Sequence, residues 1–87
     1  MSQADAFAAI ADANRRHLLE ALRRGPKTVN ELAEGLPVSR PAVSQHLKAL
    51  RDAGLVSVRN EGTRRVYRVE EAGFLKLNLW LDQFWQG

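Results

Sequence analysis

Residues 28–69 read TVNELAEGLPVSRPAVSQHLKALRDAGLVSVRNEGTRRVYRV, and this stretch decides the fold of the 87-residue chain. Thr28 and Glu31 have the spacing of a capping box, which opens a helix. Ser39 is placed to be the N-cap of a longer helix whose apolar residues recur at helical spacing. Residues 28–53 are therefore predicted to form two helices joined by a tight turn.

Glycines and turn residues divide this stretch further. Gly35 is expected to form the turn between the two helices with a positive φ, and Gly54 is expected to end the second helix. Residues 55–69 then hold two short runs rich in Val and Tyr around the turn residues 60–63, which predicts a β-hairpin. Two helices followed by a hairpin are typical of a winged helix-turn-helix, with 55–69 as the wing.

The flanking segments are predicted to be helical. Residues 3–12 are rich in alanine with apolar side chains at helical spacing, and Asn14 is the expected N-cap of a helix over 15–24. A last helix is predicted over 71–85, where large apolar side chains dominate. We therefore expect one mostly α (α+β) domain over residues 1–87.

The composition narrows the classes of protein. Hydrophobic residues make up 45% of the chain and charged residues 26%, as in folded domains. The chain has no cysteine, which excludes disulfides and thiolate chemistry, and no phosphate-binding loop or paired His and acid indicates an enzyme. Neither a leader peptide nor the roughly 20 apolar residues that span a bilayer are evident. We expect a cytoplasmic protein that is not an enzyme and does not contact membranes.

Basic residues are concentrated in the middle of the chain. The formal net charge is +3, but residues 14–69 hold twelve of the 13 Lys and Arg residues and only five of the ten acids. Such an excess attracts a polyanion. By itself it also fits an ordinary solvated surface.

The predicted outer face of the second helix carries short polar side chains and cations. Such a helix fits the major groove of DNA, where Gln pairs with adenine and Arg or Lys with guanine. Serine hydroxyls and a helix N-terminus bind phosphate oxygens. The candidate DNA-binding residues of this helix are Ser39, Arg40, Pro41, Ser44, Gln45, His46 and Lys48.

Arginines on the hairpin strengthen this interpretation. Arg64 and Arg65 follow its turn, with Arg59 and Arg68 nearby, and an arginine-bearing hairpin reaches a minor groove or flanking phosphates. We therefore expect double-stranded DNA as a partner. The alternative is a winged helix that binds only protein, which would not need these cations and would not show the steep salt dependence of DNA binding.

The sequence resembles the ArsR/SmtB family of bacterial winged helix-turn-helix repressors. Within residues 28–69, SRPAVSQHLK at 39–48 matches the family's recognition helix, and ALRDAGLV, ending at Val56, matches the exit into the wing. IADANRR at 10–16 resembles the opening of the family's second helix, with Ala13 where a proline is common. The resemblance implies a homodimer that represses a promoter at a palindromic operator and leaves when a signal arrives.

The resemblance also implies that the first and last helices form the dimer interface. The apolar content of 71–85 supports this, because one short helix cannot bury all of it within a small domain. For Leu75 and Leu79 the alternative is packing on the first helix of the same chain. The candidate interface residues are Phe7, Ile10, Phe74, Leu77, Trp80, Leu81, Phe84 and Trp85.

The metal sites of many family members are not expected here. One such site uses cysteines where this chain has residues 31–35, and another uses His on the last helix, although no His follows His46. His17 and Glu20 lack further ligands. We expect no metal and no cofactor; the alternatives for the signal are a small organic molecule, a partner protein or no direct effector. Aromatic residues of the last helix could line a ligand pocket, but at helical spacing they more often form a core or an interface.

Overall fold

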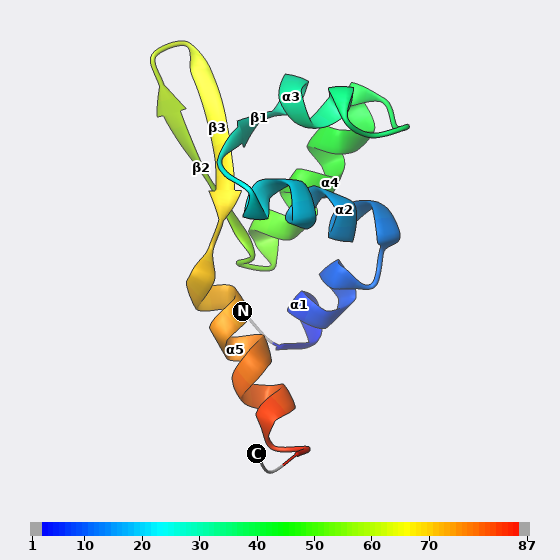
Figure 1. Cartoon of the computed structure of the whole chain (residues 1–87), viewed down its shortest axis with the longest axis vertical. Coiled ribbons are helices and arrows are strands. Elements are labelled where there is room, and N and C mark those ends of the chain that lie inside the picture. The colour runs from blue at the N-terminus through cyan, green and yellow to red at the C-terminus, as the bar shows by residue number, and fades with distance from the viewer. Residues whose placement is uncertain (1–2, 86–87) are drawn as a thin grey trace.

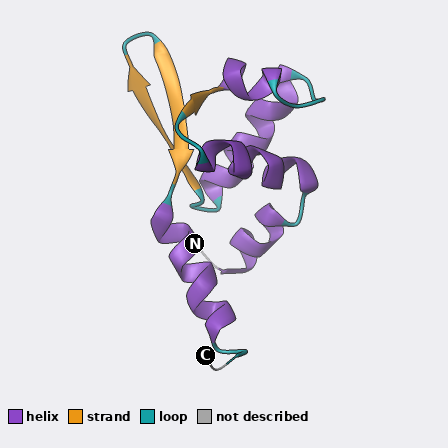
Figure 2. Cartoon of the chain, viewed as in Figure 1, coloured by secondary structure: helices purple, strands orange, loops and turns teal. Residues whose placement is uncertain are grey.

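A computed structural model describes residues 3–85 of the chain. Helices make up most of it, and the strands form one small sheet (Figure 2). This architecture confirms the predicted mostly α (α+β) winged helix-turn-helix, and none of the described helices is long and apolar enough to cross a membrane. The elements in chain order are α1 (Gln3–Ile10), α2 (Ala13–Arg23), β1 (Lys27–Thr28), α3 (Val29–Glu34), α4 (Arg40–Asp52), β2 (Val56–Glu61), β3 (Arg64–Val69) and α5 (Glu71–Asp82).

The sheet is antiparallel with the strand order β1-β3-β2. β2 and β3 stay paired up to Glu61 opposite Arg64, so the turn is reduced to Gly62 and Thr63 instead of the four predicted residues. Gly62 has a φ of 64°, which favours glycine. The sequence did not predict β1, because two residues are too few to show an alternating pattern. The hairpin of β2 and β3 projects from one end of the molecule (Figure 1).

Caps set the limits of α3 and α4. Thr28 and Glu31 form the predicted capping box at the start of α3, and the Ser39 side chain caps α4. Gly54 follows α4 with a φ of 77°, as predicted. The expectation of a positive φ at Gly35 was wrong. Its φ is −91°, so the chain leaves α3 at this residue without entering the left-handed region.

Polar contacts close the junction between α1 and α2. α2 begins two residues earlier than predicted because Asp12, rather than Asn14, is its N-cap and accepts a hydrogen bond from the backbone N–H of Arg15 at 3.1 Å. The side chain of Arg15 turns back and donates to the carbonyl oxygen of Ala9 at 2.6 Å, and Arg16 donates to two further carbonyls beyond it. Since these carbonyls have no partner within α1, the two arginines act as its C-terminal cap.

The core sits where α2, α3 and α4 meet the base of the wing. Val43, Leu47 and Leu50 of α4 are fully buried, as their helical spacing predicted. This face turns inward, so the opposite face of α4 is directed to solvent. The other fully buried large side chains are Leu18, Leu32 and Leu55.

The last helix differs most from the prediction. α5 ends at Asp82, so Phe84 and Trp85 lie beyond it. Leu77, predicted to meet a partner, is only 5% exposed and belongs to the core of its own chain. The reason is that α5 packs against α1, and Leu77 belongs to the same buried cluster as Ala6 and Ala9 of α1. Leu75 and Leu79, for which packing within the chain was the alternative, are instead exposed.

Aromatic rings join α5 to α1. Trp80 lies edge-on to Phe7, with 4.9 Å between ring centroids, and Phe84 contacts Trp80 at 4.6 Å. Phe74 and Ile10 are partly buried against the core. The apolar side chains that remain exposed at this end are Leu75, Leu79, Leu81, Phe84 and Trp85.

Candidate nucleic-acid interface

An open groove of about 780 Å³ lies between α4 and the wing. One side is formed by α4, another by β3 and its turn, and a third by Thr28 and the start of α3. Of the described residues that line it, one is acidic, Asp52, and five are basic: Arg40, Lys48, Arg51, Arg64 and Arg65. The groove is therefore strongly positive and faces away from the core.

The structure brings together five of the predicted DNA-binding residues in this groove: Arg40, Ser44, Lys48, Arg64 and Arg65. They come from two elements that are far apart in sequence. Because α4 buries its apolar stripe, its polar side chains lie on the face that is open to solvent. The sequence prediction of a joint surface of helix and wing agrees with this geometry.

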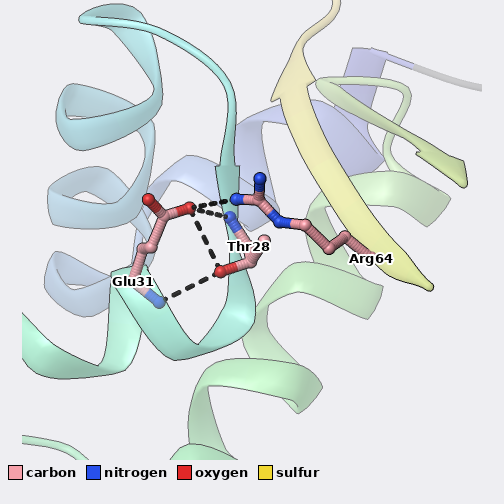
Figure 3. A network of polar contacts seen from close by, with 3 residues as sticks. All are labelled: Thr28, Glu31 and Arg64. Atoms are coloured by element: carbon pink, nitrogen blue, oxygen red, sulfur yellow. Dashed lines mark hydrogen bonds and ion pairs between the residues drawn. The ribbon is translucent and has the colours of Figure 1, made fainter. Parts of the chain in front are cut away.

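A polar network links the wing to the start of α3 (Figure 3). Glu31 Oε1 accepts hydrogen bonds from the Thr28 backbone N–H at 2.8 Å and from the Thr28 hydroxyl at 3.1 Å. The same oxygen contacts Arg64 Nη2 at 3.4 Å. The N–H of Thr28, then its hydroxyl and, less strongly, the charge of Arg64 lower the pKa of Glu31 below its ordinary value.

The other groove cations have different surroundings. Lys48 Nζ pairs with Asp52 Oδ2 at 2.9 Å, one helical turn further along α4. The Arg65 guanidinium lies over the ring of Tyr67, 5.9 Å from its centroid. Arg40 and Arg51 have no ion-pair partner among the residues that the structure describes.

Several of the elements that build this groove lie in a region that matches a known protein family. The model of the family "Bacterial regulatory protein, arsR family" matches residues 12–58, which run from the cap of α2 into β2. The chain belongs to the arsR family of bacterial regulatory proteins. This confirms the family predicted from the sequence.

Relatives of this arsR-family chain are regulators of transcription. It is 55% identical to the HTH-type transcriptional regulator Rv2034 of Mycobacterium tuberculosis over 80 residues, which are 92% of this chain and 75% of the relative. It spans about half the length of two further curated relatives. These similarities confirm a DNA-binding transcriptional regulator rather than an enzyme.

Solved structures share the fold. An ArsR-like transcriptional regulator from Rhodococcus sp. RHA1 matches with a TM-score of 0.86 and 37% identity, over 93% of this chain and 76% of that one. The solution structure of the homodimeric winged helix-turn-helix DNA-binding domain Mb0332 from Mycobacterium bovis matches with a TM-score of 0.74 and 28% identity, over 93% of this chain and 80% of that one.

The remaining predicted DNA-binding residues of the arsR-family chain lie outside the groove lining. Ser39, Pro41 and Gln45 are exposed at the start and outer face of α4. The Ser39 hydroxyl oxygen accepts a hydrogen bond from the N–H of Ala42 at 3.3 Å, so its first role is to cap the helix. Gln45 is open to solvent, as a base-reading side chain needs to be.

His46 differs from its neighbours because it is half-buried. The pKa of Asp12 is held below its ordinary value, first by the N–H of Arg15 and, among smaller causes, by the charge of His46. The half-buried position of His46 sets it apart from the exposed Gln45 beside it. A direct contact with DNA stays a prediction.

Several groove residues escaped the sequence prediction: Asn30, Thr63 and Tyr67 line it, as does Thr28. Asn30 and Thr63 are exposed polar residues on separate elements, and no spacing rule connects them. The signal for Tyr67 was available, because its position two residues after Arg65 places both on one face of β3.

No group of three or more His, Cys, Asp or Glu residues that could hold a metal ion occurs in the part of the chain that the structure describes. His17 and Glu20, considered as a pair from the sequence, are both exposed on α2.

Proposed function

We propose that this chain is a repressor that binds operator DNA with α4 in the major groove and the wing against the flanking backbone. The observation that carries the proposal is the groove itself, in which five described cations from two elements meet a single acid. A duplex presents rows of phosphates, and a groove with cations on the recognition helix and on the wing beside it suits that negative charge.

The side chains divide into two roles. Gln45 and Ser44 project from the outer face of α4 and read base edges, with Arg40 and Lys48 beside them. Arg64 and Arg65 of the wing contact phosphates or the adjacent minor groove. Affinity then comes mainly from the cations, and base preference from α4.

We also propose that the chain acts as a homodimer through α1 and α5. The exposed side chains Leu79, Leu81 and Phe84 are an apolar surface that a second copy would cover, and the similar Mb0332 domain is homodimeric. Two copies of α4 would enter successive major grooves about 34 Å apart on a palindromic operator. Binding in the cytoplasm would exclude polymerase from the promoter.

The proposed regulator senses no metal through the cysteine or histidine sites of its family, because the chain has no cysteine and no histidine after His46. Its effector is proposed to be a small molecule or a protein. The Trp80 ring contacts the rings of both Phe7 and Phe84, which favours a packing role for the aromatic cluster over a ligand pocket.

Genomic footprinting tests the proposal most directly. Purified protein should protect a few sites with inverted-repeat symmetry, and its affinity for a protected duplex should fall steeply with salt. Failure to retard any duplex at low ionic strength would reject DNA binding and favour the protein-binding alternative. Protection of sites without two-fold symmetry would reject the palindromic arrangement alone.

A further inference from the structure

Two of the five groove cations are already paired with acids of the same chain. Lys48 Nζ lies 2.9 Å from Asp52 Oδ2 on the α4 side, and Arg64 Nη2 lies 3.4 Å from Glu31 Oε1 on the wing side. All four side chains are more than half exposed. Neither acid therefore compensates a buried charge, and a DNA phosphate has access to both cations.

The remaining cations provide the contrast. Arg40, Arg51 and Arg65 line the same groove without an ion-pair partner among the described residues. Arg65 lies over the face of Tyr67. The groove thus combines cations that meet a phosphate directly with two that must first exchange a carboxylate for it.

We propose that Glu31 and Asp52 set the affinity and the salt response of DNA binding by competing with phosphates for Arg64 and Lys48. The inference rests on the proposed DNA-binding function and goes beyond it, since it gives two acidic residues a role in binding.

The physical basis is partner exchange. Exposed ion pairs are weak, so phosphates displace the carboxylates at a small cost in free energy. A displaced carboxylate then takes up a cation from solution, which offsets one counterion released from the DNA. Each pair should therefore lower the affinity and make its dependence on salt less steep.

Glu31 also caps α3, and the substitution must separate the two roles. Glu31→Gln removes the charge but retains a side chain that completes a capping box. Asp52→Asn tests the second ion pair independently. Asp52 is the last residue of α4, where a negative charge interacts unfavourably with the helix dipole, so its removal should not destabilise the helix. Glu34→Gln is the matched control on α3: Glu34 is exposed, lies outside the groove lining and has no ion-pair partner among the described residues.

The experiment measures the dissociation constant over a series of salt concentrations. The probes are a footprinted duplex and a mixed-sequence duplex of about three helical turns. Glu31→Gln and Asp52→Asn should each bind both probes roughly two- to five-fold more tightly at low salt, the range that exposed ion pairs allow. The slope of log K against log salt should steepen by up to about one for each substitution.

A double-mutant cycle shows whether Glu31 acts through Arg64. In an Arg64→Gln background, Glu31→Gln should lose most of its gain, because the cation over which carboxylate and phosphate compete is absent. A full gain in that background, or an equal gain in Glu34→Gln, would indicate a general charge effect and overturn the proposal. So would unchanged or weaker binding by both Glu31→Gln and Asp52→Asn.

The wild-type chain separates this inference from the proposed function. If the wild type binds no duplex, the function itself fails. If it binds and the two variants do not differ from it, only the competition by Glu31 and Asp52 fails. Thermal unfolding of every variant confirms that equal amounts of folded protein are compared.

Discussion

The wing end and the α5 end of the molecule leave opposite kinds of side chain exposed. At the wing end, cations from α4 and β3 surround an open groove. At the other end of the long axis, where α5 projects (Figure 1), leucines and aromatic residues are exposed, among them Leu79 at 60% and Phe84 at 65%. One end suits a polyanion and the other suits an apolar partner.

The difference suggests that the two ends act together, with association at the apolar end raising DNA affinity at the wing end. In the proposed complex a single α4 would contact a few base pairs, whereas two copies linked through their apolar ends would bind as one unit with a much higher affinity. The backbone contact between Gly73 in α5 and Gly54 after α4 connects the two ends within one chain. Changes at the apolar end should therefore alter DNA binding without touching the groove.

The largest effect is expected from Leu79→Asp. A charge in the middle of the exposed apolar surface should prevent association of two copies, and operator affinity should fall by about 100-fold or more because the half-sites are no longer coupled. Sedimentation and mobility shift on a two-half-site duplex measure this. Since Leu79 is exposed, the variant should keep the affinity of wild-type monomer for a single half-site.

A variant with an intact dimer in sedimentation would remove Leu79 from the interface. Leu81→Asp then tests the neighbouring surface, because Leu81 is also exposed and was predicted as an interface residue from the sequence. If both variants remain dimeric, the association does not use this face of α5.

Gly73→Ala should break the connection between the two ends. A Cβ at Gly73 would overlap with the carbonyl oxygen of Gly54 and lie 2.9 Å from its carbonyl carbon, so the backbone of α5 must shift. We expect a loss of about 3 kcal/mol in the free energy of unfolding, as for overpacked cores. Gly35→Ala is the control, since its Cβ would meet only the carbonyl oxygen of Leu32 at 3.8 Å. Equal urea midpoints for both variants would contradict the close contact.

The sequence predicted the wing end better than the α5 end. Caps such as Thr28 and Ser39 are local signals, and the buried stripe of α4 follows from helical spacing, so α3, α4 and the hairpin were predicted with few errors. The face of α5 that packs inward depends on where α1 lies. That is a tertiary relation, so the sequence assigned Leu77 to the interface and offered core packing for Leu79, whereas the structure buries Leu77 and exposes Leu79.

The charged groove was predicted only in part, because residue type is a local signal whereas contacts between distant elements are not. Arg40, Lys48, Arg64 and Arg65 stood out by residue type, and the order of helix and hairpin indicated a shared surface. Contacts between distant elements did not follow from any pattern. The pairing of Arg64 with Glu31, 33 residues earlier, depends on the antiparallel register of β1 and β3.

Gln45→Ala should affect the choice of base rather than overall affinity. If Gln45 makes a bidentate contact with adenine, its removal should cost about 1–3 kcal/mol at one base-pair position of the operator and relax the preference there. Competition by operators substituted at single positions measures this. An equal loss on mixed-sequence duplex would show that Gln45 does not read a base.

Arg65→Ala should have a smaller and less specific effect. Removing one phosphate contact weakens binding to all duplexes similarly and makes the slope of log K against log salt shallower by about one. Lys76→Ala, an exposed cation on α5, is the matched control and should leave the slope unchanged. If both substitutions change the slope equally, the wing is not part of the phosphate-binding surface.

The smallest effect is expected from acid, and it belongs to the wing end. The pKa of Glu31 is lowered from its ordinary value of 4.5, chiefly by the Thr28 N–H, so its stabilising contacts are fully present above pH 4.5 and are lost as the pH falls through the folded-state pKa. Glu31→Gln should therefore lose less stability than wild type between pH 4.5 and lower values, while Glu34→Gln should follow wild type. Urea midpoints at several pH values measure this. Parallel curves for wild type and Glu31→Gln would mean that the contacts of Glu31 with Thr28 and Arg64 do not depend on its ionisation. The wing end, like the apolar end, would then be stabilised by uncharged contacts.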